Sequence, residues 1–177
     1  VPTLVNAVLW GWMLNANYGL INRLLMQWGR ISEPVAWLGD AKIAMIMIVL
    51  ADTWRMLPLT VLMFLSGLQS VSAVSLEAGK IDGANVFQRF FHIILPQMKP
   101  IILVVLIMRT TQTMKVFDIV YMLTNGGPAN GTMVISFYTY YTTFKSLNFG
   151  LGATLSIVIA GIIFLITLLY LRILKEA

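Results

Sequence analysis

Residues 76–96 read LEAGKIDGANVFQRFFHIILP and form a short polar interval between long apolar segments. The first half carries acidic, basic and small residues, and the second half is rich in phenylalanine. Phe87, Phe90, Phe91 and Ile94 follow the i, i+3, i+4, i+7 spacing of an amphipathic helix. The spacing predicts a short helix whose apolar side can lie at a membrane surface or against another protein.

A second short helix is predicted just before this run. Ser72 or Ser75 can cap its start, because a serine oxygen accepts a hydrogen bond from an exposed backbone N–H. Glu77 then lies in the first turns, where the helix dipole favours an acid. Gly79 and Gly83 are four residues apart, which predicts one helical face that a partner can approach closely. An ordinary interfacial loop with turn glycines is the alternative interpretation.

Composition places this interval in a membrane protein. The chain is 59% hydrophobic and 11% charged, whereas about 25% of residues are charged in a typical soluble domain. Mean hydropathy is +0.85, and a membrane-spanning helix needs about 20 mostly apolar residues. The segments that we expect to be apolar helices are about 2–16, 43–65, 98–124 and 151–171. The predicted fold class is all-α, a polytopic transmembrane helical bundle.

Several classes of activity lack their residues in this sequence. Cysteine is absent and His92 is the single histidine, so no metal site and no thiolate chemistry is expected. The basic residues are scattered, which argues against nucleic-acid binding. No Gly-rich loop ending in Gly-Lys-Ser or Gly-Lys-Thr occurs, so the chain is not expected to hydrolyse ATP. We expect a protein that is not an enzyme.

Ionisable residues inside apolar segments are costly and usually face a cavity or a partner. Asp52 and Arg55 are three residues apart, as are Lys115 and Asp118, so each pair can form along one helix face. Arg109 is a further basic residue in such a segment. A structural ion pair and a role in a solute or proton pathway both remain open for these residues.

Polar and aromatic residues at membrane depth could also contact a solute. Residues 110–113 supply hydroxyl and amide groups, which serve equally well as contacts between helices. The aromatic stretch 137–144 is typical of an interfacial belt or an outer rim. The candidate solute-pathway residues combine flat apolar faces with hydrogen-bonding groups; they are Trp54, Gln112, Asp118 and Tyr121.

The polar interval resembles the cytoplasmic "EAA" coupling loop of binding-protein-dependent ABC-transporter permeases. The residues that carry the resemblance are Glu77, Ala78, Gly79, Asp82, Gly83 and Ala84, with Gly79 in place of a second alanine. Residues 54–69 and 117–128 are similar to flanking stretches of carbohydrate permeases of the maltose and glycerol 3-phosphate type. The likeness runs from Pro2 to about Leu174.

This resemblance implies a MetI-like, type I ABC-importer permease core with a cytoplasmic coupling helix. It implies one transmembrane permease domain over residues 1–177, with a cytoplasmic coupling loop at about 66–97. Lys and Arg are too evenly divided between the two sides to decide the orientation, so the resemblance decides it. Permeases of this type carry further helices before this point, which the chain is expected to lack. The expected location is the prokaryotic cytoplasmic (inner) membrane.

The resemblance also implies a function. The chain would be the permease subunit of an ATP-driven importer that translocates a sugar or related carbohydrate. Its expected partners are ABC ATPase subunits, a second permease subunit, an extracytoplasmic solute-binding protein and membrane lipid. ATP would be bound by the ATPase subunits, so no cofactor is expected here. The alternative is an ion-coupled secondary transporter that uses the intramembrane Asp and Arg residues.

Overall fold

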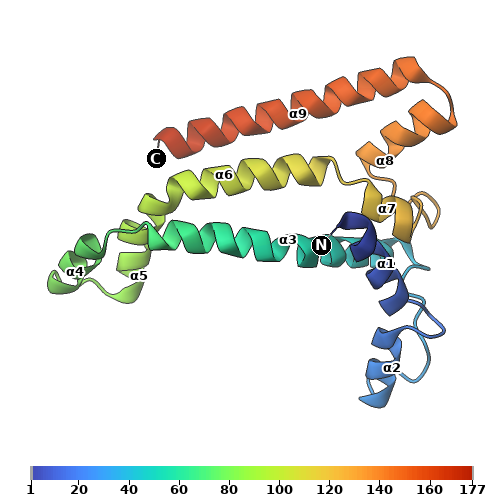
Figure 1. The fold of residues 1–177 in the computed structure, drawn as a ribbon, viewed down its shortest axis with the longest axis horizontal. Helices are drawn as coiled ribbons and strands as arrows, with labels where there is room; N and C mark the ends of the chain where they lie inside the picture. Colours follow the sequence, from blue (N-terminus) through green and yellow to red (C-terminus); the bar gives the residue numbers. More distant parts are fainter. Residues whose placement is uncertain (1, 177) are drawn as a thin grey trace. The chain divides into compact units, whose positions relative to one another are not determined.

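The computed structural model describes residues 2–176, with side chains described as far as Ile173, and every regular element in this range is helical (Figure 1). The chain forms two compact units. The first contains the residues up to Met56 together with Met114–Ala160, and the second contains Leu57–Thr113 together with the residues from Gly161 onward. That the two units act as one transmembrane domain stays a prediction.

Within the described part of the chain, three helices are long and apolar enough to cross a membrane: Ala41–Gln69, Val86–Met114 and Phe149–Ile173. They correspond to α3 (Ala41–Gln69), to α6 (Leu95–Met114) with the turns before it, and to α9 (Phe149–Glu176). At most 17% of the apolar window of any of them is buried. Such apolar surfaces need lipid or neighbouring helices to cover them, which confirms the predicted helical membrane fold.

The prediction that the third apolar helix spans about 98–124 is wrong at both ends. The helix begins earlier, at Val86, and ends at Met114. A separate short helix, α7 (Asp118–Leu123), follows after Phe117, whose φ of −135° lies outside the helical range. The sequence has no proline or glycine at this break. Instead, the ring of Phe117 packs against other rings at the point where the helix is interrupted.

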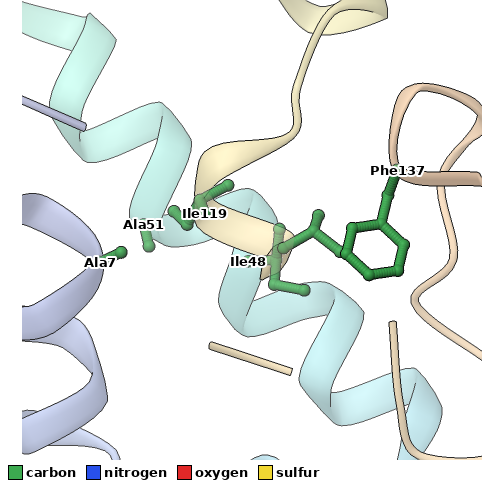
Figure 2. Close-up of a cluster of buried hydrophobic side chains, with 6 residues drawn as sticks. Ala7, Ile48, Ala51, Ile119 and Phe137 are labelled. Atoms are coloured by element: carbon green, nitrogen blue, oxygen red, sulfur yellow. The ribbon is translucent and has the colours of Figure 1, made fainter. Parts of the chain in front are cut away.

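The core of the first unit lies where α3 meets α1 (Thr3–Met13), α7 and α8 (Ile135–Tyr140). Figure 2 shows side chains from these four helices converging on this core. Its buried members are Ala7, Ile48, Ala51, Ile119, Val120 and Phe137. Alanines on both α1 and α3 allow a close approach, and Asn6 Nδ2 donates to the Ala51 carbonyl at 3.1 Å. This bond ties α1 to α3.

A buried asparagine organises the connection between α1 and α3. Asn22 lies on α2 (Leu20–Gln27), and its Nδ2 donates to the carbonyls of Ala16 at 3.2 Å and Val35 at 2.9 Å. Its Oδ1 accepts from the Val35 N–H at 3.2 Å and from Trp37 Nε1 at 2.9 Å. One side chain therefore fixes segments on both sides of α2.

The chain leaves the helical conformation between α7, which ends at Leu123, and α8, which begins at Ile135. Gly126 has a φ of +83°, which disfavours any residue with a side chain. A Cβ added there would also lie 2.8 Å from Phe137 Cε1, so the position has no space for one. The hydroxyl of Thr132 closes the turn, donating to the Gly127 carbonyl at 2.6 Å. After α8 the chain continues into a π-helical turn, η2 (Tyr141–Lys145), and then α9.

In the second unit, the later part of α3 packs against α6. Gly67 is buried there, and an added Cβ would lie 2.9 Å from Ile101 Cγ2. The Thr110 and Tyr170 hydroxyls form a hydrogen bond of 3.0 Å between α6 and α9. A small residue and one polar contact are typical means of holding membrane helices together.

Candidate functional site

The polar interval folds as two short helices joined by a tight turn, next to the start of α6 (Figure 1). The first, α4 (Ala73–Ile81), is capped by Ser72, whose Oγ accepts from the Ser75 N–H at 3.3 Å. The Ser72 N–H itself donates to Gln97 Oε1 of α6 at 2.9 Å. The predicted cap at Ser72 is confirmed, and it also anchors the start of α4 to α6.

Gly83 ends this first helix. Its N–H donates to the Lys80 carbonyl at 3.1 Å, and the Ala84 N–H donates to the Gly79 carbonyl at 2.9 Å. These two bonds form a Schellman motif, which needs a left-handed residue at the position of Gly83, where φ is +76°. The prediction that Gly79 and Gly83 share one helical face is therefore wrong. Gly83 lies beyond the helix and reverses the chain.

Gly79 lies inside α4 and is buried. A Cβ added there would lie 2.6 Å from Ile93 Cδ1 and 3.6 Å from Arg89 Cγ. The close approach that this glycine allows is thus made within the chain, between α4 and the π-helical turn η1 (Phe90–Ile94). The expectation that Gly79 receives a partner surface is wrong for this residue.

The second short helix, α5 (Val86–Arg89), begins with a reciprocal capping box. Asn85 Oδ1 accepts from the Gln88 N–H at 2.9 Å, and Gln88 Oε1 accepts from the Asn85 N–H at 2.8 Å. This capping box is not among the features predicted from the sequence, although an Asn followed three residues later by Gln is its signal. From Val86 the chain is helical without a break as far as Met114, through η1 and α6.

Pro96 and Pro100 do not interrupt this run. Both lie within α6, and η1 ends at Ile94, two residues before Pro96. A proline has no N–H to donate, so the hydrogen-bond pattern changes locally while the helix continues. The phenylalanine-rich turns therefore join directly to a membrane-spanning helix.

The outer side of this element is apolar and accessible. Ile81 is 87% exposed, Val74 77%, Phe87 75% and Val86 69%. Of the residues assigned to coupling, Glu77, Ala78, Asp82 and Gly83 are exposed, Ala84 is half-buried and Gly79 is buried. We call the exposed set the coupling surface; it consists of Val74, Glu77, Ala78, Ile81, Asp82, Gly83, Val86 and Phe87. Large apolar side chains gathered on a polar loop mark a surface that contacts another protein or the membrane.

Asp52 and Arg55 form an ion pair in the first unit. Arg55 Nη2 lies 2.7 Å from Asp52 Oδ1, and the side chains are only 16% and 11% exposed, respectively. Removing either partner of such a pair would leave a poorly solvated charge. The predicted pairing of these two residues along one helix face is confirmed, and a role of the pair in a solute pathway stays a prediction.

The second expected pair is not formed. Among the described residues, no ion pair joins Lys115 to Asp118, and both side chains are exposed. Asp118 is the first residue of α7, where the helix dipole favours a carboxylate. Its position is explained without Lys115.

The four candidate solute-pathway residues have different surroundings. Trp54 packs edge-on against Trp10, with ring centroids 6.5 Å apart, and Tyr121 stacks on Phe117 at 5.5 Å. Gln112 belongs to the other unit, where its buried Oε1 has no hydrogen-bond partner among the described residues. That these residues and Asp118 line one pathway stays a prediction.

Comparison with known proteins identifies the family. The family described as "Binding-protein-dependent transport system inner membrane component" matches residues 1–175. The chain belongs to this family. Its members are the inner-membrane components of binding-protein-dependent transport systems. The permease-family resemblance and the inner-membrane location expected from the sequence are thereby confirmed.

Similar curated proteins include the trehalose/maltose transport system permease MalF of Thermococcus litoralis, 41% identical over 98% of this chain and 58% of the relative. The sulfoquinovosyl glycerol permease SmoG of Agrobacterium fabrum is 34% identical over 99% of this chain and 56% of the relative. The lactose permease LacF of Rhizobium radiobacter is 40% identical over 80% of this chain and 48% of the relative. The chain therefore spans about half the length of these relatives.

A solved structure has the same fold. A chain of a bacterial ABC transporter involved in the import of the acidic polysaccharide alginate superposes with a TM-score of 0.84. The match covers 99% of this chain and 61% of that chain, at 21% identity. It confirms the all-helical importer-permease fold.

Proposed function

We propose that the chain forms the permease core of an ATP-driven importer for a carbohydrate that an extracytoplasmic binding protein delivers. ABC ATPase subunits bind the ATP, and a second permease chain completes the pathway. The observation that carries this proposal is the coupling surface, an exposed apolar patch on an element whose first and last turns both contact the helical run of 86–114.

The fastening explains how an ATPase movement reaches the membrane. Ser72 is bonded to Gln97 at the start of α4, and Gly79 packs against Ile93 in its last turn. Gln97 and Ile93 both belong to the continuous helical run of 86–114. A displacement of α4 therefore moves α6 with it, because no flexible joint separates the contacts.

The carbohydrate class rests on the relatives. Two of them are permeases for trehalose/maltose and for lactose, and a third serves sulfoquinovosyl glycerol. Within this pathway we assign solute contacts to Trp54, Gln112, Asp118 and Tyr121, which combine flat rings with hydrogen-bonding groups. The ion-coupled alternative finds no support, since Asp52 and Arg55 already neutralise each other.

The test is association of the full-length protein with its ATPase. Ala78 is exposed on α4, so Ala78→Arg places bulk on the coupling surface without disturbing the chain's own packing. Ala73→Arg is the matched control, because Ala73 is also exposed on α4 and lies about 140° around the helix from Ala78.

We expect wild type and Ala73→Arg to co-purify in mild detergent with an ATPase subunit, and Ala78→Arg to lose it together with ATP-dependent uptake. Equal ATPase recovery and equal uptake for the two variants would show that the coupling surface is not the contact. A folded wild-type complex that contains no ATPase would refute the proposed function itself.

A further inference from the structure

The first unit contains a cavity of about 550 Å³ that the proposed pathway residues do not line. This volume falls within the range of small-molecule sites, roughly 300–1,000 Å³. Its walls come from α8, η2, the start of α9 and Phe117. Gly152 makes this arrangement possible, since a Cβ there would collide with Thr143 Oγ1.

Four of the lining residues are aromatic. Tyr140 lies between two others, with its ring centroid 4.7 Å from that of Phe117 and 5.4 Å from that of Phe144. Phe144 and Phe149 are 61% and 60% exposed, so their rings are accessible. The negative face of such a ring attracts the C–H groups on the flat side of a pyranose.

Four other lining residues carry hydroxyl groups, and each of these hydroxyls already donates its proton to a backbone carbonyl. Thr139 Oγ1 donates to the Ile135 carbonyl at 2.8 Å, and Thr143 Oγ1 donates to the Thr139 carbonyl at 2.7 Å. Ser156 Oγ donates to the Gly152 carbonyl in the same way, and Ser136 Oγ donates to the Val116 carbonyl. Each oxygen keeps lone pairs, so the wall accepts hydrogen bonds from the hydroxyl groups of a ligand.

The lining contains no Asp, Glu, Lys, Arg or His. A phosphate, sulfonate or carboxylate would find no cation in this lining to replace the water that it gives up on binding. We propose that the cavity binds an uncharged saccharide, so that it selects neutral over anionic carbohydrates. This inference rests on the proposed function and adds a binding site and a charge class to it.

Filling the cavity tests the proposal. Ala153 lines it and is exposed on α9, so Ala153→Phe blocks the site at a position that tolerates a larger side chain. Ala160→Phe is the matched control, because Ala160 is exposed on the same helix and lies outside the lining. Both variants are made in the full-length protein and reconstituted with its transport partners, with maltose as the neutral probe and sn-glycerol 3-phosphate as the anionic probe.

We expect wild type and Ala160→Phe to take up maltose and to discriminate against the phosphate ester. We expect Ala153→Phe to lose at least about tenfold in apparent affinity for maltose while the complex stays assembled. Equal maltose affinity for the two variants, or wild-type preference for the anionic probe, would overturn the inference while leaving carbohydrate import intact. Loss of a partner subunit in Ala153→Phe alone would show that the cavity is a subunit contact, and uptake of neither probe by wild type would count against the proposed function.

Discussion

Gly79 provides the sharpest test of how the coupling element is built. The substitution Gly79→Ala has two opposing effects. Alanine is favoured over glycine inside a helix by about 1 kcal/mol. The new Cβ, however, would lie 2.6 Å from Ile93 Cδ1, so the side chain of Ile93 must move. Overpacking of this kind costs about 1–3 kcal/mol. We therefore expect Gly79→Ala to destabilise the packing of α4 by up to about 2 kcal/mol, the difference between these two terms.

Shortening the residue that meets the new methyl group separates the two effects. Ile93→Val removes Cδ1, the atom in closest contact. Since Ile93 is only half-buried, this change alone should cost near the lower end of the usual range of about 0.5–1.5 kcal/mol. In that background Gly79→Ala should stabilise α4 by about 1 kcal/mol, because only the helix-propensity term remains.

The quantity to measure is the free energy of local opening of α4. Native-state hydrogen exchange of the amides of residues 76–81 in the detergent-solubilised full-length protein reports it, because this segment can open without global unfolding. Wild type, both single variants and the double variant form a cycle. Effects that add to within about 0.5 kcal/mol would refute the reasoning, because they would show that Gly79 and Ile93 are not in contact.

Two further predictions concern backbone conformation and buried charge. Gly83→Asp should destabilise the turn between α4 and α5 by about 1–2 kcal/mol, because φ there is +76°. Gly83→Asn should cost less, since asparagine adopts the left-handed conformation more readily. Solute uptake and hydrogen exchange of residues 79–84 would rank the two variants. Equal uptake and equal exchange for both would contradict a backbone role for Gly83. Asp52→Asn should cost about 3–5 kcal/mol by leaving Arg55 without its partner in a largely buried place. Thermal unfolding in detergent would measure this loss, and an unchanged midpoint would show that the pair is dispensable.

The linear order of residues was sufficient for the features that depend on local chemistry. The long apolar runs predict membrane-spanning helices because hydrocarbon leaves a backbone no partner but itself. Ser72 is identifiable as a cap because its oxygen bonds a backbone N–H only three residues away. The acidic, small-residue string at 77–84 indicates the family from sequence alone.

Only the tertiary structure decided the separate roles of the two glycines. Gly79 is small because Ile93, fourteen residues later, occupies the space of its side chain. Gly83 is required by its own backbone angle, which depends on where α4 stops. The aromatic cavity likewise brings Phe117 together with residues 136–156 across an intervening turn. These features depend on which distant segments meet, and neither hydropathy nor capping signals contain that information.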